Sequence, residues 1–366
     1  MEDEPYPEYA SKFPELGFYV LPGHTRTPRD AIRQVQDAEA LGIGNVMLSE
    51  RYDYKEASAI CGAMAAATES IYIGTSATNL NTRHPVLTAT MATTLNKLSN
   101  GRFALGLGKG AAMRWKAMGL KPITFQQEAE FVDLLRQLWR GEPITNFKGA
   151  LGEFAHLNLA EYIQEDIPVL FVGFGPKGLQ HAGRIYDGVH LHTFMNDRAL
   201  RSAVDQVRSG EADTNRADGT VKVWSVMATT CGGSEEDYLK HIIARLVTYL
   251  QVPGYGDTLA KINGWDADTL QEIRNHPSVS SVGGLVDSLA TPRQLEQIEK
   301  IIPQEWRTAA VGSPKECAEA WVAQLKAGAD GVIIHASTPE EFAPIVSEYE
   351  MIRPTELLTG RRNRPA

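Results

Sequence analysis

The 366 residues include 36 lysines and arginines against 45 aspartates and glutamates, which gives a formal net charge of −9 at neutral pH. Such an acidic chain repels the phosphates of nucleic acids, so no nucleic-acid partner is expected. No apolar run reaches the ~18 residues that a membrane helix needs, and the amino terminus lacks a signal-peptide pattern, so we expect a cytoplasmic protein outside the membrane.

The cysteines and the metal-ligating residues do not form groups. Cys61, Cys231 and Cys317 are odd in number and far apart, which fits buried small side chains in a reducing compartment and no disulfide framework. The chain has no His-Glu-x-x-His motif and no close cluster of histidines with acidic residues, so we predict no metal site. The Gly-x-Ser-x-Gly pattern of a serine hydrolase is also missing.

Short apolar runs alternate with helical patterns along the chain. The runs are continuous rather than half polar, as in strands that are buried on both faces of a parallel sheet. The predicted strands cover residues 16–21, 45–48, 71 onward, 101–108, 168–172, 188–192, 221–230 and 330–335. The predicted helices cover residues 28–41, 55–67, 85–98, 113–118, 125–139, 177–184, 197–208, 235–250 and 339–352. Eight such units close most naturally into a (β/α)8 TIM barrel.

The domain organisation follows from these units. We expect an N-terminal tail over residues 1–15, one barrel domain over 16–353 and a C-terminal tail over 354–366 that frays at its basic end. Residues 141–161 fit a hairpin outside the main sheet. About eighty residues of helical character precede the last strand, more than a connection needs. We therefore expect a helical insertion at about 253–310, before strand eight, that caps the barrel or forms a subunit contact.

The stretch over residues 71–85 joins a strand to a helix through small and polar side chains, Gly-Thr-Ser-Ala-Thr-Asn. Small residues at the end of a buried strand leave room for a flat group against the backbone. Pro85 fits the first turn of the following helix, where its missing N–H costs nothing. Ligands of α/β folds bind at rims of this kind.

In a barrel, the residues that follow each strand form the ring in which an active site is built. After the first two strands this ring receives His24 and the adjacent pair Glu50 and Arg51. Such a pair is either a surface ion pair, worth under ~1 kcal/mol, or a proton carrier beside an anion clamp. His190 and His192 lie on one predicted strand, and only one of them is expected to face the barrel interior.

The segment at residues 173–178, Gly-Phe-Gly-Pro-Lys-Gly, connects the fifth predicted strand to its helix. Backbone N–H groups at the helix start and the ammonium group of Lys177 suit a phosphate. The alternative is a tight turn whose glycines are needed for a positive φ. A second glycine-rich stretch, Gly-Leu-Gly-Lys-Gly at 106–110, is a weaker signal.

Together these motifs resemble the luciferase-like superfamily of flavin and deazaflavin proteins, specifically its coenzyme F420-dependent branch, over residues 16–352. The resemblance rests on residues 74–79, 82–85, 105–110, 173–178, 182–184, 187–188, 312–314 and 327–330. It implies a TIM barrel with the cofactor ring at the carboxyl ends of the strands and a non-proline cis peptide bond at Ser76–Ala77. It also implies cofactor contacts from Ser76, Ala77, Thr78, Asn79, Lys109, Gly110, Gly173, Phe174, Gly175, Pro176, Lys177 and His192.

The activity that the resemblance implies is hydride transfer between C5 of coenzyme F420 and a small organic substrate, with Glu50, Arg51 and His24 as catalytic candidates. Many members have Asp-His where this chain has Glu50-Arg51, and glucose-6-phosphate dehydrogenases have a glutamate where this chain has Ala111, so that sugar phosphate activity is not expected. Two alternatives stay open, an FMN-dependent monooxygenase and a barrel that binds flavin or deazaflavin without turnover. Because relatives are often dimers, the resemblance also leaves a homodimer open.

Overall fold

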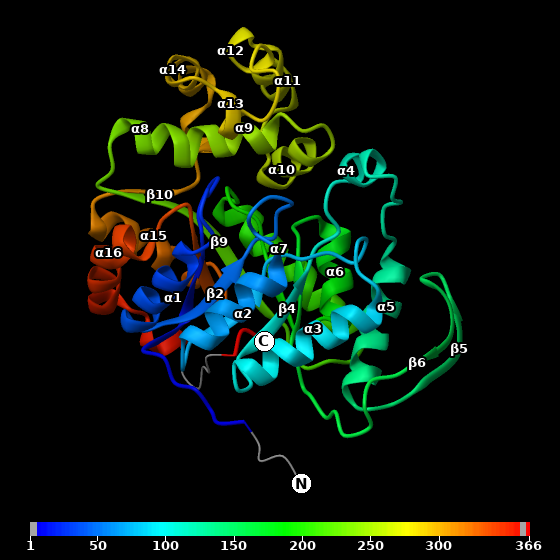
Figure 1. Cartoon of the computed structure of the whole chain (residues 1–366). Coiled ribbons are helices and arrows are strands. Elements are labelled where there is room, and N and C mark those ends of the chain that lie inside the picture. Colours follow the sequence, from blue (N-terminus) through cyan, green and yellow to red (C-terminus); the bar gives the residue numbers. More distant parts are fainter. Residues whose placement is uncertain (1–5, 359–363) are drawn as a thin grey trace.

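The computed structural model describes residues 6–358 and 364–366, and its main feature is a closed ring of eight parallel strands (Figure 1). In ring order the strands are β1 (Phe13–Tyr19), β2 (Ile43–Leu48), β3 (Tyr72–Thr75), β4 (Phe103–Leu107), β7 (Val169–Val172), β8 (Gly188–His190), β9 (Lys222–Cys231) and β11 (Gly331–His335). Because β1 pairs with both β2 and β11, the first and last strands of the ring are neighbours. The predicted (β/α)8 TIM barrel is confirmed.

Helices cover the outside of the ring (Figure 1). They are α1 (Asp30–Ala40), α2 (Ala57–Ala67), α3 (Pro85–Leu98), α5 (Phe125–Trp139), α6 (Pro176–Ile185), α7 (Asp197–Asp213), α15 (Pro314–Lys326) and α16 (Pro339–Ile352). A helix is predicted from residue 28, but α1 begins at Asp30 because the chain still turns there, with the Ala31 N–H donating to the Pro28 carbonyl. As predicted, Pro85 occupies the first turn of α3.

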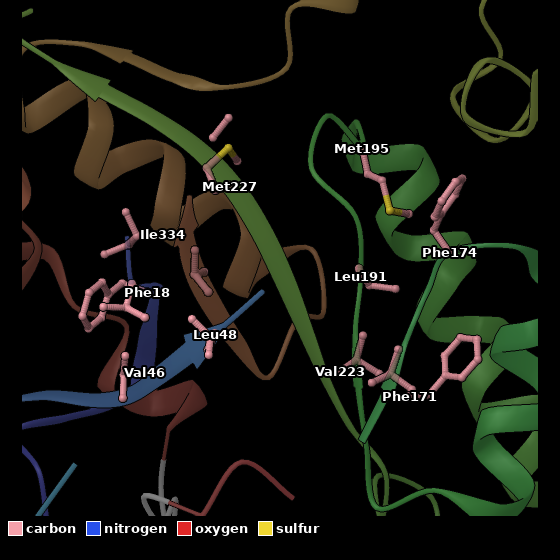
Figure 2. Close-up of a cluster of buried hydrophobic side chains, with 14 of the residues drawn as sticks. Phe18, Val46, Leu48, Phe171, Phe174, Leu191, Met195, Val223, Met227 and Ile334 are labelled. Atoms are coloured by element: carbon pink, nitrogen blue, oxygen red, sulfur yellow. The ribbon is translucent and has the colours of Figure 1, made fainter. Parts of the chain in front are cut away.

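The strands are buried on both faces, and successive residues belong to different layers of the core. The layer between the sheet and the helices includes the side chains gathered in Figure 2, among them Phe18, Val46, Leu48 and Ile334. Their neighbours in the chain fill the interior of the barrel in a separate cluster of Tyr19, Met47, Trp224, Val226 and Ile333. This interior is therefore packed with side chains, and a ligand has to bind at one end of the ring.

The helical insertion covers the end of the ring to which the strands point. It consists of α8 (Glu235–Tyr238), the π-helix η1 (Leu239–Ala244), α9 (Arg245–Leu250), α10 (Tyr255–Asn263), α11 (Ala267–Asn275), α12 (Pro277–Ser280), α13 (Val286–Leu289), α14 (Pro292–Ile301) and the 3₁₀-helix η2 (Gln304–Trp306). We call residues 235–306 the cap; it lies above the barrel in Figure 1.

The cap begins earlier than the expected insertion at 253–310. The helical stretch over residues 235–250 was expected to cover the seventh strand, but it belongs to the cap, and α15 packs against β9 and β11 in its place. The amphipathic pattern of residues 235–250 shows that one face is buried and does not specify the partner. The short strand β10 (Ala310–Gly312) returns the chain beside the end of β9.

Both ends of the chain differ from the expected tails. Strand β1 already begins at Phe13, and the buried Glu15 carboxylate accepts hydrogen bonds from Arg353 at 2.7 Å. At the other end, Pro365 is buried and its carbonyl accepts a hydrogen bond of 2.9 Å from Trp224 Nε1. The predicted fraying is therefore wrong for residues 364–366, while 1–5 and 359–363 lie outside the described residues.

Three short elements complete the chain. Strands β5 (Ile144–Gly149) and β6 (Gly152–Leu157) form an antiparallel hairpin away from the ring, as predicted for residues 141–161. Helix α4 (Ala112–Ala117) follows β4, and the 3₁₀-helix η3 (Thr355–Leu357) follows α16. Within residues 6–358 and 364–366, no helix has both the length and the apolar composition to cross a bilayer.

Candidate active site

The ends of three neighbouring strands, β3, β4 and β7, form a surface of small residues. The peptide bond between Ser76 and Ala77 is cis, as the sequence resemblance implies. The Gly108 N–H donates to the Thr78 carbonyl at 2.9 Å, and a Cβ on Gly108 would lie 2.9 Å from Ala77 Cβ. The Val172 carbonyl is close as well, at 3.7 Å from that Cβ position. We call Ala77, Gly108 and the backbone around them the platform.

A buried hydrogen-bond network supports the platform from the barrel interior. The Ser76 hydroxyl lies 2.6 Å from the Tyr19 hydroxyl and 3.1 Å from His190 Nδ1. Burial lowers the pKa of His190 to about 3, so this ring is neutral at physiological pH. Ser76 therefore faces the interior, and its side chain holds the strand end in place.

Glu50 is fixed by three donors at the β2 and β3 ends. Its carboxylate accepts from Arg83 Nη2 at 2.7 Å, from Thr78 Oγ1 at 2.6 Å and from the Ala57 N–H at 3.2 Å. The same Arg83 nitrogen also contacts Glu56 at 2.7 Å. The Glu50 side chain is only 7% exposed. This arrangement holds Thr78 beside the platform and leaves the carboxylate little access to a ligand.

Asn79 is also held by protein partners. Its amide nitrogen donates to the Tyr52 hydroxyl at 3.1 Å, and its oxygen accepts from the N–H and the hydroxyl of Thr82, both at 3.0 Å. The side chains of Thr78 and Asn79 are thus bound to other protein groups, and the Thr78 backbone carbonyl contacts the platform at Gly108.

The segment that follows β7 leads directly into α6. Gly175 is the N-cap residue, with no side-chain cap, and a Cβ built on it meets nothing within 4 Å. Pro176 occupies the first turn, and Lys177 is exposed beside it. The open N–H groups of the first turn favour an anion.

The alternative explanation of these glycines, a turn that needs positive φ, is wrong, because neither Gly173 nor Gly175 has a positive φ. Gly173 is needed for packing instead, since a Cβ there would lie 2.8 Å from the Phe171 ring.

Lys109 and Gly110 follow β4. Lys109 Nζ lies 3.7 Å from the centre of the Phe125 ring and 4.0 Å from the buried Glu128 carboxylate, and burial lowers its pKa. Gly110 has a φ of 61°, and a Cβ there would lie 2.6 Å from the Trp115 ring. The left-handed backbone and the close Trp115 ring therefore both require glycine at this position, and the Lys109 ammonium group points toward α5.

His192 lies just beyond the end of β8. The expectation that only one of His190 and His192 faces the interior is wrong in its reasoning, because residues two apart in a strand share a face. Its ring centre is 4.7 Å from that of Phe174, 4.4 Å from that of Tyr249 and 5.3 Å from that of Tyr255. Burial lowers the pKa of His192 to about 4, and its Nδ1 lies 2.7 Å from the Thr193 carbonyl. His192 joins the β7 segment to aromatic side chains of the cap.

His24 and Arg51 meet where the β1 and β2 ends face the cap. Arg51 Nη1 lies 3.2 Å from His24 Nδ1, and His24 Nε2 lies 2.9 Å from the Ser288 hydroxyl of α13. His24 is also 3.5 Å from the Asp287 carboxylate, which Arg245 of α9 contacts at 2.5 Å. We call this place, where Arg51, His24, Arg245 and Asp287 converge, the mouth.

Sequence reasoning did not select three charged residues of the mouth, Lys55, Arg245 and Asp287. Lys55 is 2% exposed, and its ammonium group donates to the Leu21 and Gly23 carbonyls. Burial, with a contribution from Arg51, lowers its pKa to about 7. Lys55 could have been noticed as a lysine at the expected start of a helix, whereas no local signal distinguishes Arg245 or Asp287.

The described part of the chain, residues 6–358 and 364–366, has no group of three histidine, cysteine or acidic side chains arranged to hold a metal ion. Cys61 and Cys317 are buried as predicted, whereas Cys231 is partly exposed at the end of β9.

Comparison with known proteins places the chain in a family. The model of the luciferase-like monooxygenase family matches residues 15–331. The chain belongs to this family. Among curated relatives, the 5,10-methylenetetrahydromethanopterin reductase of Methanolobus tindarius is 28% identical over 263 residues, which are 71% of this chain and 78% of that protein. An F420-dependent glucose-6-phosphate dehydrogenase of Amycolatopsis mediterranei is 27% identical over 218 residues, 54% of this chain and 64% of the relative.

The fold of this luciferase-like protein is also found among solved structures. The coenzyme F420 dependent tetrahydromethanopterin reductase from Methanopyrus kandleri superposes with a TM-score of 0.76 at 19% identity, over 94% of this chain and 99% of that one. At this identity the likeness establishes the barrel fold. The activity has to be argued from the site.

Proposed function

We propose that this luciferase-like protein is a coenzyme F420-dependent oxidoreductase that moves a hydride between the deazaflavin and a small organic substrate. The observation that carries the proposal is the position of the platform beside the open N-terminus of α6, since β3, β4 and β7 are consecutive in the ring. A cofactor that carries both a flat ring and a phosphate needs a surface for the ring and an anion site close to each other. The names of the relatives, reductases and dehydrogenases that use F420, support the same cofactor.

The residues present fit this cofactor. Ala77 and Gly108 carry almost no side chain where a ring has to approach the backbone, and the space at Gly175 is open. We propose that the platform backs the ring, that Phe174, Gly175, Pro176 and Lys177 hold the phosphate, and that His192 lies beside them. When bound, the deazaflavin supplies the hydride donor or acceptor at its C5.

The protein's own contribution is to orient the reactants and exclude water. We propose that Arg51 fixes an oxygen of the substrate and that His24 exchanges a proton at the mouth through Nε2, because Nδ1 accepts from Arg51. Glu50 was the other candidate for the proton carrier. Because its oxygens already accept from Arg83, Thr78 and Ala57, we now assign it the positioning of Thr78.

Titration of the purified protein with oxidised F420, reduced F420 and FMN, followed by fluorescence, tests the cofactor. We expect F420 to bind at least about tenfold more tightly than FMN, a difference of about 1.4 kcal/mol. Gly175→Val should weaken F420 binding, because its side chain occupies the open space at α6, whereas Gly219→Ala is a control at a distant loop.

Absence of F420 binding would end the proposal. FMN retained through purification would favour the alternative of a monooxygenase, which the name of the family supports. F420 binding without turnover of any alcohol, aldehyde or imine offered would favour the non-catalytic barrel. The cytoplasmic location and a homodimer stay predictions.

A further inference from the structure

The guanidinium group of Arg51 is held in the mouth without an acidic partner. Among residues 6–358 and 364–366, its side chain has one polar contact, with His24 Nδ1 at 3.2 Å, and no carboxylate of these residues lies within 4 Å of it. Burial lowers the pKa of Arg51, and the nearby Arg245 lowers it further. A partly buried guanidinium group next to a second one is unfavourable unless an anion compensates for it.

Within the described residues, the carboxylate that contacts the mouth directly belongs to the cap, while the charge of Asp53 counteracts the lowering of the pKa of Arg51 and Lys55 without an ion pair to either. Asp287 is 8% exposed and contacts Arg245, which is 11% exposed, at 2.5 Å. The same carboxylate lies 3.5 Å from His24, and the Asp287 N–H donates to the Thr248 hydroxyl at 2.8 Å. One carboxylate therefore faces two arginines, with Lys55 a further donor nearby.

We infer that the substrate carries an oxyanion, a carboxylate or a phosphate, which binds between Arg51 and Arg245, and that Asp287 is the internal competitor it displaces. The inference rests on the proposed function, because it names the class of substrate for that site. An incoming oxyanion could accept from both guanidinium groups, whereas Asp287 is tied to Arg245 by its place on α13.

The same geometry explains how the cap would respond. Arg245, Asp287 and Ser288 belong to the cap, while Arg51 and His24 belong to the barrel. In the absence of substrate, Asp287 and Ser288 tie the cap to His24; with an oxyanion bound, Arg245 and Arg51 share a ligand across the same boundary. Substrate binding would replace one link between cap and barrel with another.

Inorganic phosphate is the probe for a test on the full-length protein. Its binding is measured by isothermal titration calorimetry at pH 7 and low ionic strength, with the wild type, Asp287→Asn and Arg51→Met. Asp257→Asn is the matched control, because Asp257 forms a similar pair with Arg274 inside the cap, at 2.9 Å. Thermal melts show whether each variant is folded, and Arg51→Lys replaces Arg51→Met if the latter is not.

We expect Asp287→Asn to bind phosphate about tenfold more tightly than the wild type, because the competing charge is gone, and Asp257→Asn to match the wild type. Arg51→Met should bind about tenfold more weakly. Equal affinity of the wild type and Asp287→Asn, or of the wild type and Arg51→Met, overturns the inference.

Titration with F420 distinguishes the substrate's anion from the cofactor's own phosphate. We expect Arg51→Met to bind F420 as the wild type does, and phosphate to bind also in the presence of saturating F420. If Arg51→Met loses F420 affinity in step with phosphate affinity, the anion is the cofactor's and the inference is overturned. If the wild type binds phosphate as expected but not F420, the oxyanion site stands and the proposed function fails.

Discussion

Replacement of Glu50 separates a positioning role from a proton-carrying role. Its three donors lie at 2.6, 2.7 and 3.2 Å, and hydrogen bonds to a charged group contribute about 1.5–3 kcal/mol each. In Glu50→Ala, the buried Thr78 hydroxyl and the Ala57 N–H lose their acceptor, while Arg83 keeps Glu56. We therefore expect the free energy of unfolding to fall by about 4 kcal/mol.

Glu50→Gln keeps the shape of the side chain and one carbonyl oxygen. The amide oxygen can still accept from Arg83 and Ala57, and the Thr78 hydroxyl can rotate to accept from the new amide group, so we expect a loss of only about 1–2 kcal/mol. Urea unfolding followed by tryptophan fluorescence measures both values. Glu340→Ala serves as a control, since Glu340 is 83% exposed and should change stability by less than about 0.5 kcal/mol.

Kinetics with F420 complete the test. A positioning role predicts weaker F420 binding in Glu50→Ala, because Thr78 shifts beside the platform, and a kcat within a few-fold of the wild type in Glu50→Gln. A proton carrier would lose about 10²–10⁴-fold in kcat when its acid is removed, with unchanged F420 affinity. A large loss of kcat in Glu50→Gln at wild-type stability would refute the positioning role.

Three further outcomes are expected. Gly108→Ala places a methyl group 2.9 Å from Ala77 Cβ, so F420 affinity, measured by titration, should fall about tenfold while Gly219→Ala leaves it unchanged. In the folded protein the pKa of Lys55 is about 7, below its usual 10.5, so between these two pH values the unfolded chain binds more protons than the folded one. The free energy of unfolding should therefore rise by up to about 1.4 kcal/mol per pH unit from pH 7 to 9. Urea unfolding measures this rise, which Lys55→Met should lack. Glu15→Gln weakens the buried contact with Arg353, so the free energy of unfolding should fall by about 2–4 kcal/mol. An unchanged urea midpoint would contradict a stabilising role for this contact.

The barrel and the platform could be predicted because their signals are local. Continuous apolar runs, each followed by a helical pattern, specify the parallel strands, and the small residues around Ala77 and Gly108 mark the rim without any knowledge of their partners. The segment at Gly175 was recognisable for the same reason, as a glycine-rich link from an apolar strand to a helix with a lysine beside it.

The charged contacts of the site depend on the folded path of the chain. Arg83 and Glu50 are 33 residues apart, and each looks like an ordinary surface charge in the sequence. Arg245 and Asp287 lie in the cap, where no local pattern specifies which face turns toward the barrel. The role assigned to Glu50 therefore changed once its partners were known, while the small-residue rim kept its interpretation.

The attachment of the cap has a consequence for how such proteins diversify. The chain leaves the ring at Cys231 of β9 and returns beside it at Gly312 of β10, and these two residues are register partners, with the Gly232 N–H donating to the Gly312 carbonyl at 3.0 Å. A segment whose two ends meet can be exchanged for one of another length without shifting the register of the strands. We therefore expect chimeras that exchange residues 233–309 between relatives to keep the reaction of the barrel and to change their substrate specificity.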